Sequence, residues 1–101
     1  VYLEVSEPTR YRIVQELSTG VLLTASKLSP LLHQDQRQVS KHLRALRECG
    51  LVFEQPGVDR RFNFNGIHRK FLRGLQDGVY IVDFGSGVLR IPAPAPLKAN
   101  S

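Results

Sequence analysis

The stretch that most constrains the fold is QRQVSKHLRALREC, residues 36–49, which carries the strongest helical pattern in the sequence. On a helical wheel, the apolar residues fall on one side, together with a histidine and the only cysteine: Val39, Leu43, Leu46, His42 and Cys49. Charged residues fall opposite, and polar ones lie on the flanks: Arg37, Lys41, Arg44 and Glu48, with Gln36, Gln38, Ser40 and Arg47 beside them. Asp35 can cap the first turn and Gly50 suits the end. The pattern predicts an amphipathic helix with one buried and one basic side.

Two shorter helices are predicted before it. The first covers residues 7–19: Ser6 or Glu7 can cap it, Pro8 suits an early position, and Gly20 can end it. Its apolar residues are Ile13, Val14 and Leu17. After a short strand or extended link at residues 21–23, Thr24 can cap a second helix over residues 25–32.

The second helix is expected to turn Leu28, Leu31 and Leu32 inward. Pro30 lies inside it, and a proline in a helix interior costs about 3 kcal/mol. We therefore expect this helix to bend there or to divide into two short pieces. His33 and Gln34 form the turn that follows.

After Gly50 the apolar pattern changes to a period of two. Residues 51–55 and 60–65 predict two strands around the turn Pro-Gly-Val-Asp, with arginines at the tip. Residues 67–76 predict another helix, with Arg69, Lys70 and Arg73 outside. Residues 79–84 and 88–91 flank Gly-Ser-Gly and predict a second hairpin. We therefore expect a domain over residues 1–91 and a proline-rich flexible tail over residues 92–101.

The positive charge is concentrated in the middle of the chain. Of 101 residues, 14 are Lys or Arg and 9 are Asp or Glu, giving a net charge of +5. Residues 34–73 contain nine of the bases and four of the acids, so this segment carries the whole excess. Such a cluster is typical of proteins that bind polyanions. The alternative is a solvated charged surface without a partner.

The order of the elements predicts a winged helix-turn-helix of α+β class, mostly helical, with a two-stranded wing and a short C-terminal hairpin. In this architecture the second helix of the pair enters the major groove of DNA. Gln can pair there with adenine, and Arg or Lys with guanine. The wing follows the backbone or enters the adjacent minor groove, which suits Arg60 and Arg61 at its tip.

Two motifs resemble a known family. EPTRYRIVQEL resembles the opening "DPTR-x-RIL-x-L" helix of ArsR-type bacterial repressors, and VSKHLRALRECGLV resembles their "VS-[RK]-HL-x-x-L-[RK]-x-AGLV" recognition helix. The resemblance covers about residues 6–65. It implies a homodimeric transcriptional regulator that binds an imperfect palindrome, with dimer contacts from the N-terminal residues and the helix near residues 67–76. DFGSGVLRIP is also similar to the C-terminal hairpin of some members without metal sites.

The resemblance also implies individual roles. In the major groove it places Gln36, Arg37, Gln38, Ser40 and Lys41. It places Arg44 near phosphate and Arg60 and Arg61 in the wing. Asp35 stands where the family usually has serine; as an acid near DNA it can weaken binding or accept from a cytosine amine. For each arginine the alternative is a solvated helix face.

Neither a metal site nor a redox switch is predicted. A zinc site needs about four converging ligands, whereas His33, His42 and His68 lie in three different elements. The stretch LLTASKL, which corresponds to the metal-binding "C-x-C" helix of some members, has no thiolate or imidazole. Cys49 is predicted to be a packing residue, because a redox switch usually needs an exposed thiolate and a second cysteine. His42 is predicted to be a hydrogen-bonded packing residue.

The sequence therefore predicts a sequence-specific regulator of double-stranded DNA, most simply a dimeric repressor that senses no metal and needs no cofactor. The alternative is a winged-helix module that binds protein and does not read DNA. An enzyme is not supported, since no nucleophile–base pair or cofactor fingerprint is present. Without a transmembrane span or signal peptide, and with a lone cysteine, the chain is expected to be cytoplasmic.

Overall fold

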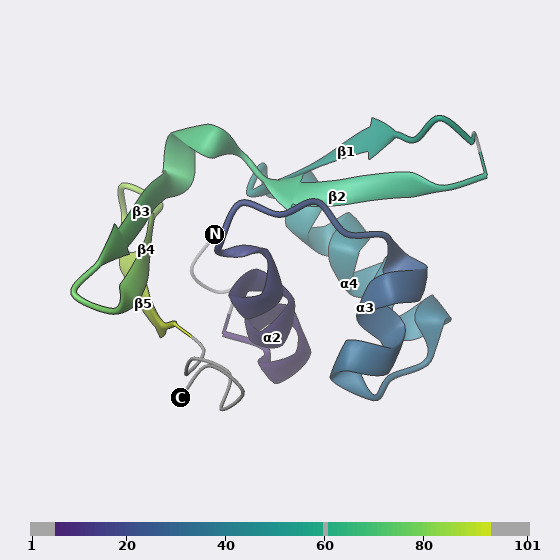
Figure 1. The fold of residues 1–101 in the computed structure, drawn as a ribbon. Helices are drawn as coiled ribbons and strands as arrows, with labels where there is room; N and C mark the ends of the chain where they lie inside the picture. Colours follow the sequence, from purple (N-terminus) through teal and green to yellow (C-terminus); the bar gives the residue numbers. More distant parts are fainter. Residues whose placement is uncertain (1–5, 60, 94–101) are drawn as a thin grey trace, which may run out of the picture.

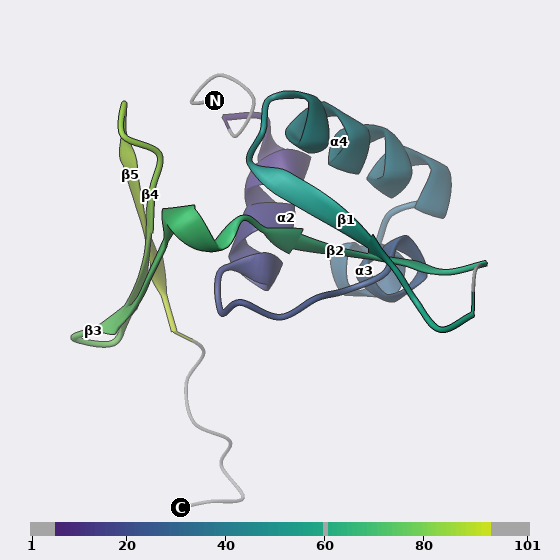
Figure 2. The same cartoon turned by 90° about the horizontal axis from the view of Figure 1, so that it is seen from above.

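The computed structural model describes residues 6–59 and 61–93. Within these, the helices α2 (Pro8–Leu17), α3 (Ala25–Leu32) and α4 (Gln36–Glu48) pack together beneath an antiparallel hairpin, β1 (Val52–Pro56) and β2 (Asn63–Ile67) (Figure 1). A 3-10 turn, η1 (Arg69–Phe71), leads to β3 (Leu72–Gln76), β4 (Val79–Asp83) and β5 (Val88–Pro92), which form an antiparallel sheet in that order. This sheet and the α3–α4 pair lie on opposite sides of α2 (Figure 2). The architecture confirms the predicted α+β winged helix-turn-helix.

Side-chain caps start each of the three α-helices where the sequence predicts. The Thr9 N–H donates to Glu7 Oε1 at 2.7 Å, and the Lys27 N–H donates to Thr24 Oγ1 at 3.1 Å. Asp35 caps α4 through a longer bond of 3.3 Å from the Arg37 N–H. These bonds satisfy N–H groups that have no partner within the helix.

The end of α4 is set by Gly50, whose φ of 86° lies in the left-handed region. The Gly50 N–H donates to the Arg47 carbonyl at 3.0 Å, and the Leu51 N–H donates to the Leu46 carbonyl at 3.1 Å. This pair of bonds is a Schellman motif, which satisfies the last carbonyls of the helix and turns the chain into β1.

The expected division of α3 into two pieces at Pro30 is wrong, because the structure has a single helix over Ala25–Leu32. Pro30 lies only two residues before the end, so its missing N–H removes one hydrogen bond of the ladder. Its own carbonyl still accepts from the His33 N–H at 3.3 Å. The inward placement of Leu28 and Leu32 is confirmed, whereas Leu31 remains 47% exposed.

One hydrophobic core joins the helices, the wing and the sheet. Its members from the helices include Ile13, Val14, Leu17, Leu28, Leu32, Val39, Leu43 and Leu46. The wing contributes Val52 and Ile67, and the C-terminal sheet contributes Val82 and Ile91. Because all are almost completely buried, the sheet is part of the same folding unit as the helices.

The predicted helix over residues 67–76 is wrong. Ile67 ends β2, and the segment from Leu72 to Gln76 is a strand that pairs with β4. The reason is the dipeptide Asp77-Gly78, with φ values of 53° and 78°, which makes the tight turn of a hairpin with Gln76 opposite Val79. The second predicted hairpin, β4–β5, is confirmed, but it belongs to a three-stranded sheet. The dimer helix expected near residues 67–76 is therefore absent from the described chain.

The segment before α3 extends the wing on its inner edge. Leu23 and Asn65 exchange two backbone hydrogen bonds, of 2.9 and 2.7 Å, which confirms the extended link predicted at residues 21–23. The expectations for residues 1–5 and for the tail beyond Ala93 lie outside the described residues. Among the described helices, none has the length and apolar character needed to cross a membrane.

Candidate nucleic-acid interface

The outer face of α4 gathers the predicted groove-facing residues on one surface. The helix is oriented by Val39, Leu43 and Leu46, each at most 1% exposed, which pack into the core. The side chains opposite are all exposed: Gln36, Arg37, Gln38, Ser40, Lys41 and Arg44. The structure thus brings together every predicted site residue of this helix. Asp35, at the start of α4, is exposed beside them.

The turn between α3 and α4 is held by hydrogen bonds to α2 and to α3. Gln34 Nε2 donates to Thr9 Oγ1 of α2 at 2.9 Å, and Ser29 Oγ donates to the Gln34 carbonyl. Arg12 Nη1 donates to the Leu32 carbonyl at 3.0 Å, which satisfies the C-terminal end of α3. These bonds fix the position of α4 relative to the other two helices.

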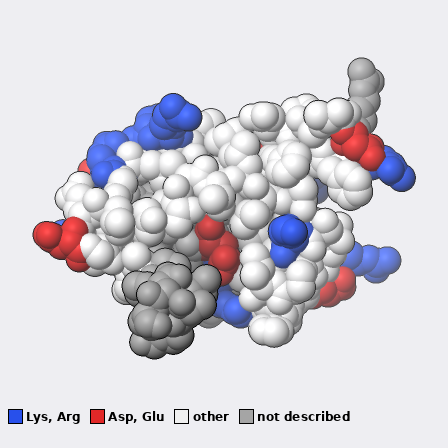
Figure 3. Space-filling model, in the orientation of Figure 1, with Lys and Arg blue, Asp and Glu red and all other residues white. Residues whose placement is uncertain are grey.

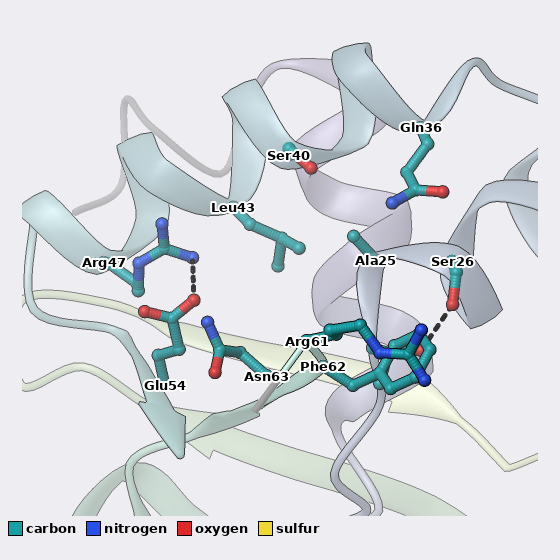
Figure 4. A pocket seen from close by; sticks show the side chains of 11 residues that line it. Ala25, Ser26, Gln36, Ser40, Leu43, Arg47, Glu54, Arg61, Phe62 and Asn63 are labelled. Carbon is teal, nitrogen blue, oxygen red and sulfur yellow. Dashed lines mark hydrogen bonds and ion pairs between the residues drawn. The ribbon is translucent and has the colours of Figure 1, made fainter. Parts of the chain in front are cut away.

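A groove of about 200 Å³ lies between α4, the start of α3 and the wing (Figure 4). Gln36, Ser40 and Arg47 line it from α4, whereas Arg61 and Asn63 line it from the wing. Helix and wing therefore share one concave surface. Charge is distributed unevenly elsewhere: the face in Figure 3 is largely uncharged, with Lys and Arg mainly at its margins.

The wing arginine that the structure describes, Arg61, is held by a neighbouring acid. Its Nη2 lies 2.8 Å from Asp59 Oδ2, and its backbone N–H donates to Asp59 Oδ1 at 3.0 Å. These bonds hold the pKa of the Asp59 carboxyl below its ordinary value and raise the pKa of the Arg61 guanidinium. Both groups are charged near neutral pH, so Arg61 reaches a phosphate only by sharing or leaving Asp59. Arg60 lies outside the described residues.

The structure adds residues to this interface that the sequence analysis did not single out. Phe62 lines the groove and is 45% exposed, with the Arg61 guanidinium 5.7 Å from its ring centroid. Ser26, at the start of α3, and Glu54, on β1, also line the groove. A phenylalanine beside an arginine at a predicted hairpin tip is a signal available in the sequence, whereas its exposure is not. The position of Ser26 depends on packing between elements.

Arg44 and Arg47 have different surroundings although they lie on the same helix. Arg44 is exposed, and it borders a shallow hollow along α4 together with Arg37, Ser40, Lys41 and Arg47. The Arg47 side chain is only 29% exposed and turns toward the wing. The two residues therefore differ in what they can offer to DNA.

His42 and Cys49 lie at the border of the core. His42 Nδ1 accepts from Arg10 Nε at 3.1 Å and lies 3.3 Å from Glu7 Oε2, so it joins α4 to the start of α2. Although burial by itself raises the pKa of the Glu7 carboxyl, the Thr9 N–H, His42 and Arg10 bring that pKa below its ordinary value. Cys49 is partly buried against the core, with its Sγ 3.3 Å from the Leu46 carbonyl. Both residues take the packing positions predicted for them.

No three His, Cys, Asp or Glu side chains of the described residues converge in a way that could hold a metal ion. The chemistry of the groove is instead that of amides, hydroxyls and guanidinium groups on a helix that a major groove can admit. Together with the wing, these groups define the class: a winged helix-turn-helix DNA-binding domain.

Residues 7–53 match the sequence model of the bacterial regulatory proteins of the arsR family. This stretch, a little under half of the chain, runs from the cap of α2 into β1 and contains the whole helix-turn-helix. The match supports an ArsR-type helix-turn-helix regulator, whose general function is DNA-binding transcription regulation. Neither a curated protein nor a solved structure shows significant similarity to it.

Proposed function

We propose that the protein is a sequence-specific repressor that binds double-stranded DNA as a homodimer, at an imperfect palindrome, and whose DNA binding does not depend on a metal. The observation that carries this proposal is the groove in which the exposed face of α4 and the wing residue Arg61 meet. A module that had lost DNA binding would need no such continuity between helix and wing.

The proposed contacts follow from the chemistry of the exposed groups. Gln36, Arg37, Gln38, Ser40 and Lys41 face the major groove, Arg44 lies near phosphate, and Arg60 and Arg61 belong to the wing. Amide and guanidinium groups match base edges, whereas ammonium and guanidinium groups also attract phosphate. The proposal includes no catalytic residue and no cofactor, and its DNA target implies a cytoplasmic site of action.

Selection from a random-sequence duplex pool tests the proposal directly. The parent protein is expected to enrich duplexes that share an inverted repeat, and its affinity for them should fall steeply with salt. Each phosphate contacted contributes about −0.9 to the slope of log K against log salt concentration. A pool without enrichment, or a slope near zero, would contradict the proposal and favour the protein-interaction module.

Gln38→Ala separates base reading from simple attraction to phosphate. The variant should lose about 1–3 kcal/mol of discrimination between a recovered duplex and a scrambled one, because a glutamine amide forms two hydrogen bonds with one adenine. Gln55→Ala is the matched control, since Gln55 is an exposed glutamine of β1 outside the groove. Equal discrimination by both variants would show that Gln38 reads no base.

The homodimer is supported by the outer face of the C-terminal sheet. Val79, Ile81, Val88 and Arg90 line a hollow of about 420 Å³ there, and alternation along β4 puts Val79 and Ile81 opposite the face of Val82, which packs into the core. Ile81→Asp should therefore convert a dimer to a monomer in sedimentation experiments. Leu75→Asp is the control, because Leu75 is exposed but pairs with Tyr80 on the other face. A parent protein that sediments as a monomer would contradict the dimer.

Repression and independence from metal need a cellular and a chemical test. A reporter placed behind a recovered duplex should be expressed more strongly when the protein is removed than when it is present. Binding to the same duplex should be unchanged by a chelator or by added zinc. Activation of the reporter, or a metal-dependent change in affinity, would overturn these two parts of the proposal separately.

A further inference from the structure

Arg47 connects the recognition helix to both strands of the wing. Its Nη1 donates to Asn65 Oδ1 of β2 at 3.0 Å. The same atom lies 3.9 Å from Glu54 Oε2 of β1 (Figure 4). Glu54 and Asn65 are directly opposite each other in the hairpin. The guanidinium therefore faces an acceptor on each strand, which an arginine can serve with separate N–H groups.

Asn65 extends the connection to the segment before α3. It is a polar residue that is only 3% exposed, and its Nδ2 donates to the Leu23 carbonyl at 3.3 Å. Its backbone N–H and carbonyl also pair with Leu23. Because a buried amide without partners would cost free energy, Arg47 and Leu23 together make the burial of Asn65 possible.

These contacts join three segments that are distant in sequence: α4 through Arg47, the wing through Asn65 and Glu54, and the entry to α3 through Leu23. The covalent link between α4 and the wing is the short chain through Gly50, whose left-handed conformation acts as a bend, and Val52 and Ile67 of the wing also pack into the core that α4 shares. The side-chain contact starts from Arg47, the next-to-last residue of α4, and adds a second connection that restrains rotation of the hairpin about this bend.

We propose that Arg47 is a positioning residue that sets the angle between the recognition helix and the wing, and that it contacts no DNA itself. The inference rests on the proposed DNA binding and deepens it: Arg47 determines whether Arg61 reaches the duplex while α4 is in the major groove. Arg44, exposed on the same helix, serves the DNA directly.

A double-mutant cycle tests the proposal, with a duplex recovered by the parent protein from the random-sequence pool. Arg61→Ala should weaken binding about fivefold in the parent protein and less than about twofold in an Arg47→Met background, since the wing is already displaced there. Arg44→Met is the matched control, and its loss should multiply with that of Arg61→Ala. Losses that multiply for Arg47→Met as well would show that Arg47 acts independently of Arg61 and would overturn the proposal.

A second measurement needs no DNA. Arg47→Met should speed amide hydrogen exchange in the wing, including the Asn65 N–H, while α2 keeps the protection of the parent protein. Unchanged exchange in the wing would overturn the proposal even if DNA binding is intact. Conversely, faster exchange in a protein whose parent enriches no duplex would sustain the connection and reject the proposed function.

Discussion

The recognition helix and the wing differ in whether their Lys and Arg side chains are already paired with an acid. Arg37, Lys41 and Arg44 on α4 form no ion pair with any described residue, whereas Arg61 in the wing is bound to Asp59. The helix therefore offers charge that DNA can use at once. In the wing, a phosphate must share Arg61 with Asp59 or replace that acid. The comparison teaches that the two parts of one basic surface contribute unequally to affinity.

The largest effect is expected from removing a core side chain that holds α4 in place. Leu46→Ala deletes a completely buried side chain and should lower the free energy of unfolding by about 2–5 kcal/mol. Thermal or urea unfolding followed by circular dichroism measures the change. Leu75→Ala, at a 54% exposed position, should change it by less than about 0.5 kcal/mol. Similar losses in both variants would contradict the core described for α4.

Charge removal on the two parts should differ in size. Lys41→Ala should weaken binding to all duplexes about tenfold at low salt and reduce the salt slope by about 0.9, since it removes a free cation. Arg61→Ala should cost about fivefold, because part of its attraction is already used by Asp59. Titrations by fluorescence anisotropy at several salt concentrations give both quantities. A larger loss for Arg61→Ala would reverse the comparison.

Removing the acid that holds Arg61 should bring the contribution of the wing to DNA affinity closer to that of α4. Asp59→Asn removes the acid that holds Arg61 and is expected to raise affinity for duplex DNA about two- to fivefold. The same substitution in an Arg61→Ala background should have a smaller effect, since no arginine is left to release. If affinity falls instead, Asp59 is needed to hold the wing tip in its bound form.

Acid should weaken the helical part through Glu7. Its folded-state pKa is below the ordinary value of 4.5, so its contribution to stability is fully present above that value and is lost as the pH falls through the lower, folded-state pKa. Unfolding measured between neutral pH and acid should therefore show a smaller loss of stability for Glu7→Gln than for the parent protein. Equal losses would mean that the contacts with Thr9 and His42 contribute nothing to stability.

Local signals explain why the helix-turn-helix was predicted closely. Thr24 and Asp35 cap backbone groups two or three residues away, and Gly50 acts within one turn of the helix. Their effects can therefore be predicted from short stretches of sequence. A local sequence signal could also have prevented the wrong prediction of a helix over residues 67–76. Asp77-Gly78 is a strong hairpin signal, and Gly74, at a φ of 80°, has a conformation that no helix contains.

In the candidate interface, too, some features follow from local sequence and others depend on distant residues. The exposed face of α4 follows from the helical period, because Val39, Leu43 and Leu46 must turn inward together. The buried state of Asn65 does not follow from any period. In the stretch Arg-Phe-Asn-Phe-Asn the phenylalanines are the apolar members, yet Asn65 is buried while Phe62 is 45% exposed. Partners from Leu23 and Arg47, 42 and 18 residues away, make this possible.

The sequence by itself determined the three helices, the two-stranded wing and the basic outer face of α4, because capping, turn chemistry and amphipathic periods act over a few residues. Only the tertiary structure decided which arginines are free. Arg44 and Arg47 share a helix and a charge, but Arg47 meets Asn65 and Glu54 while Arg44 meets solvent. Hydrogen bonding of a buried polar group depends on which distant segments pack beside it, and that is a property of the folded chain.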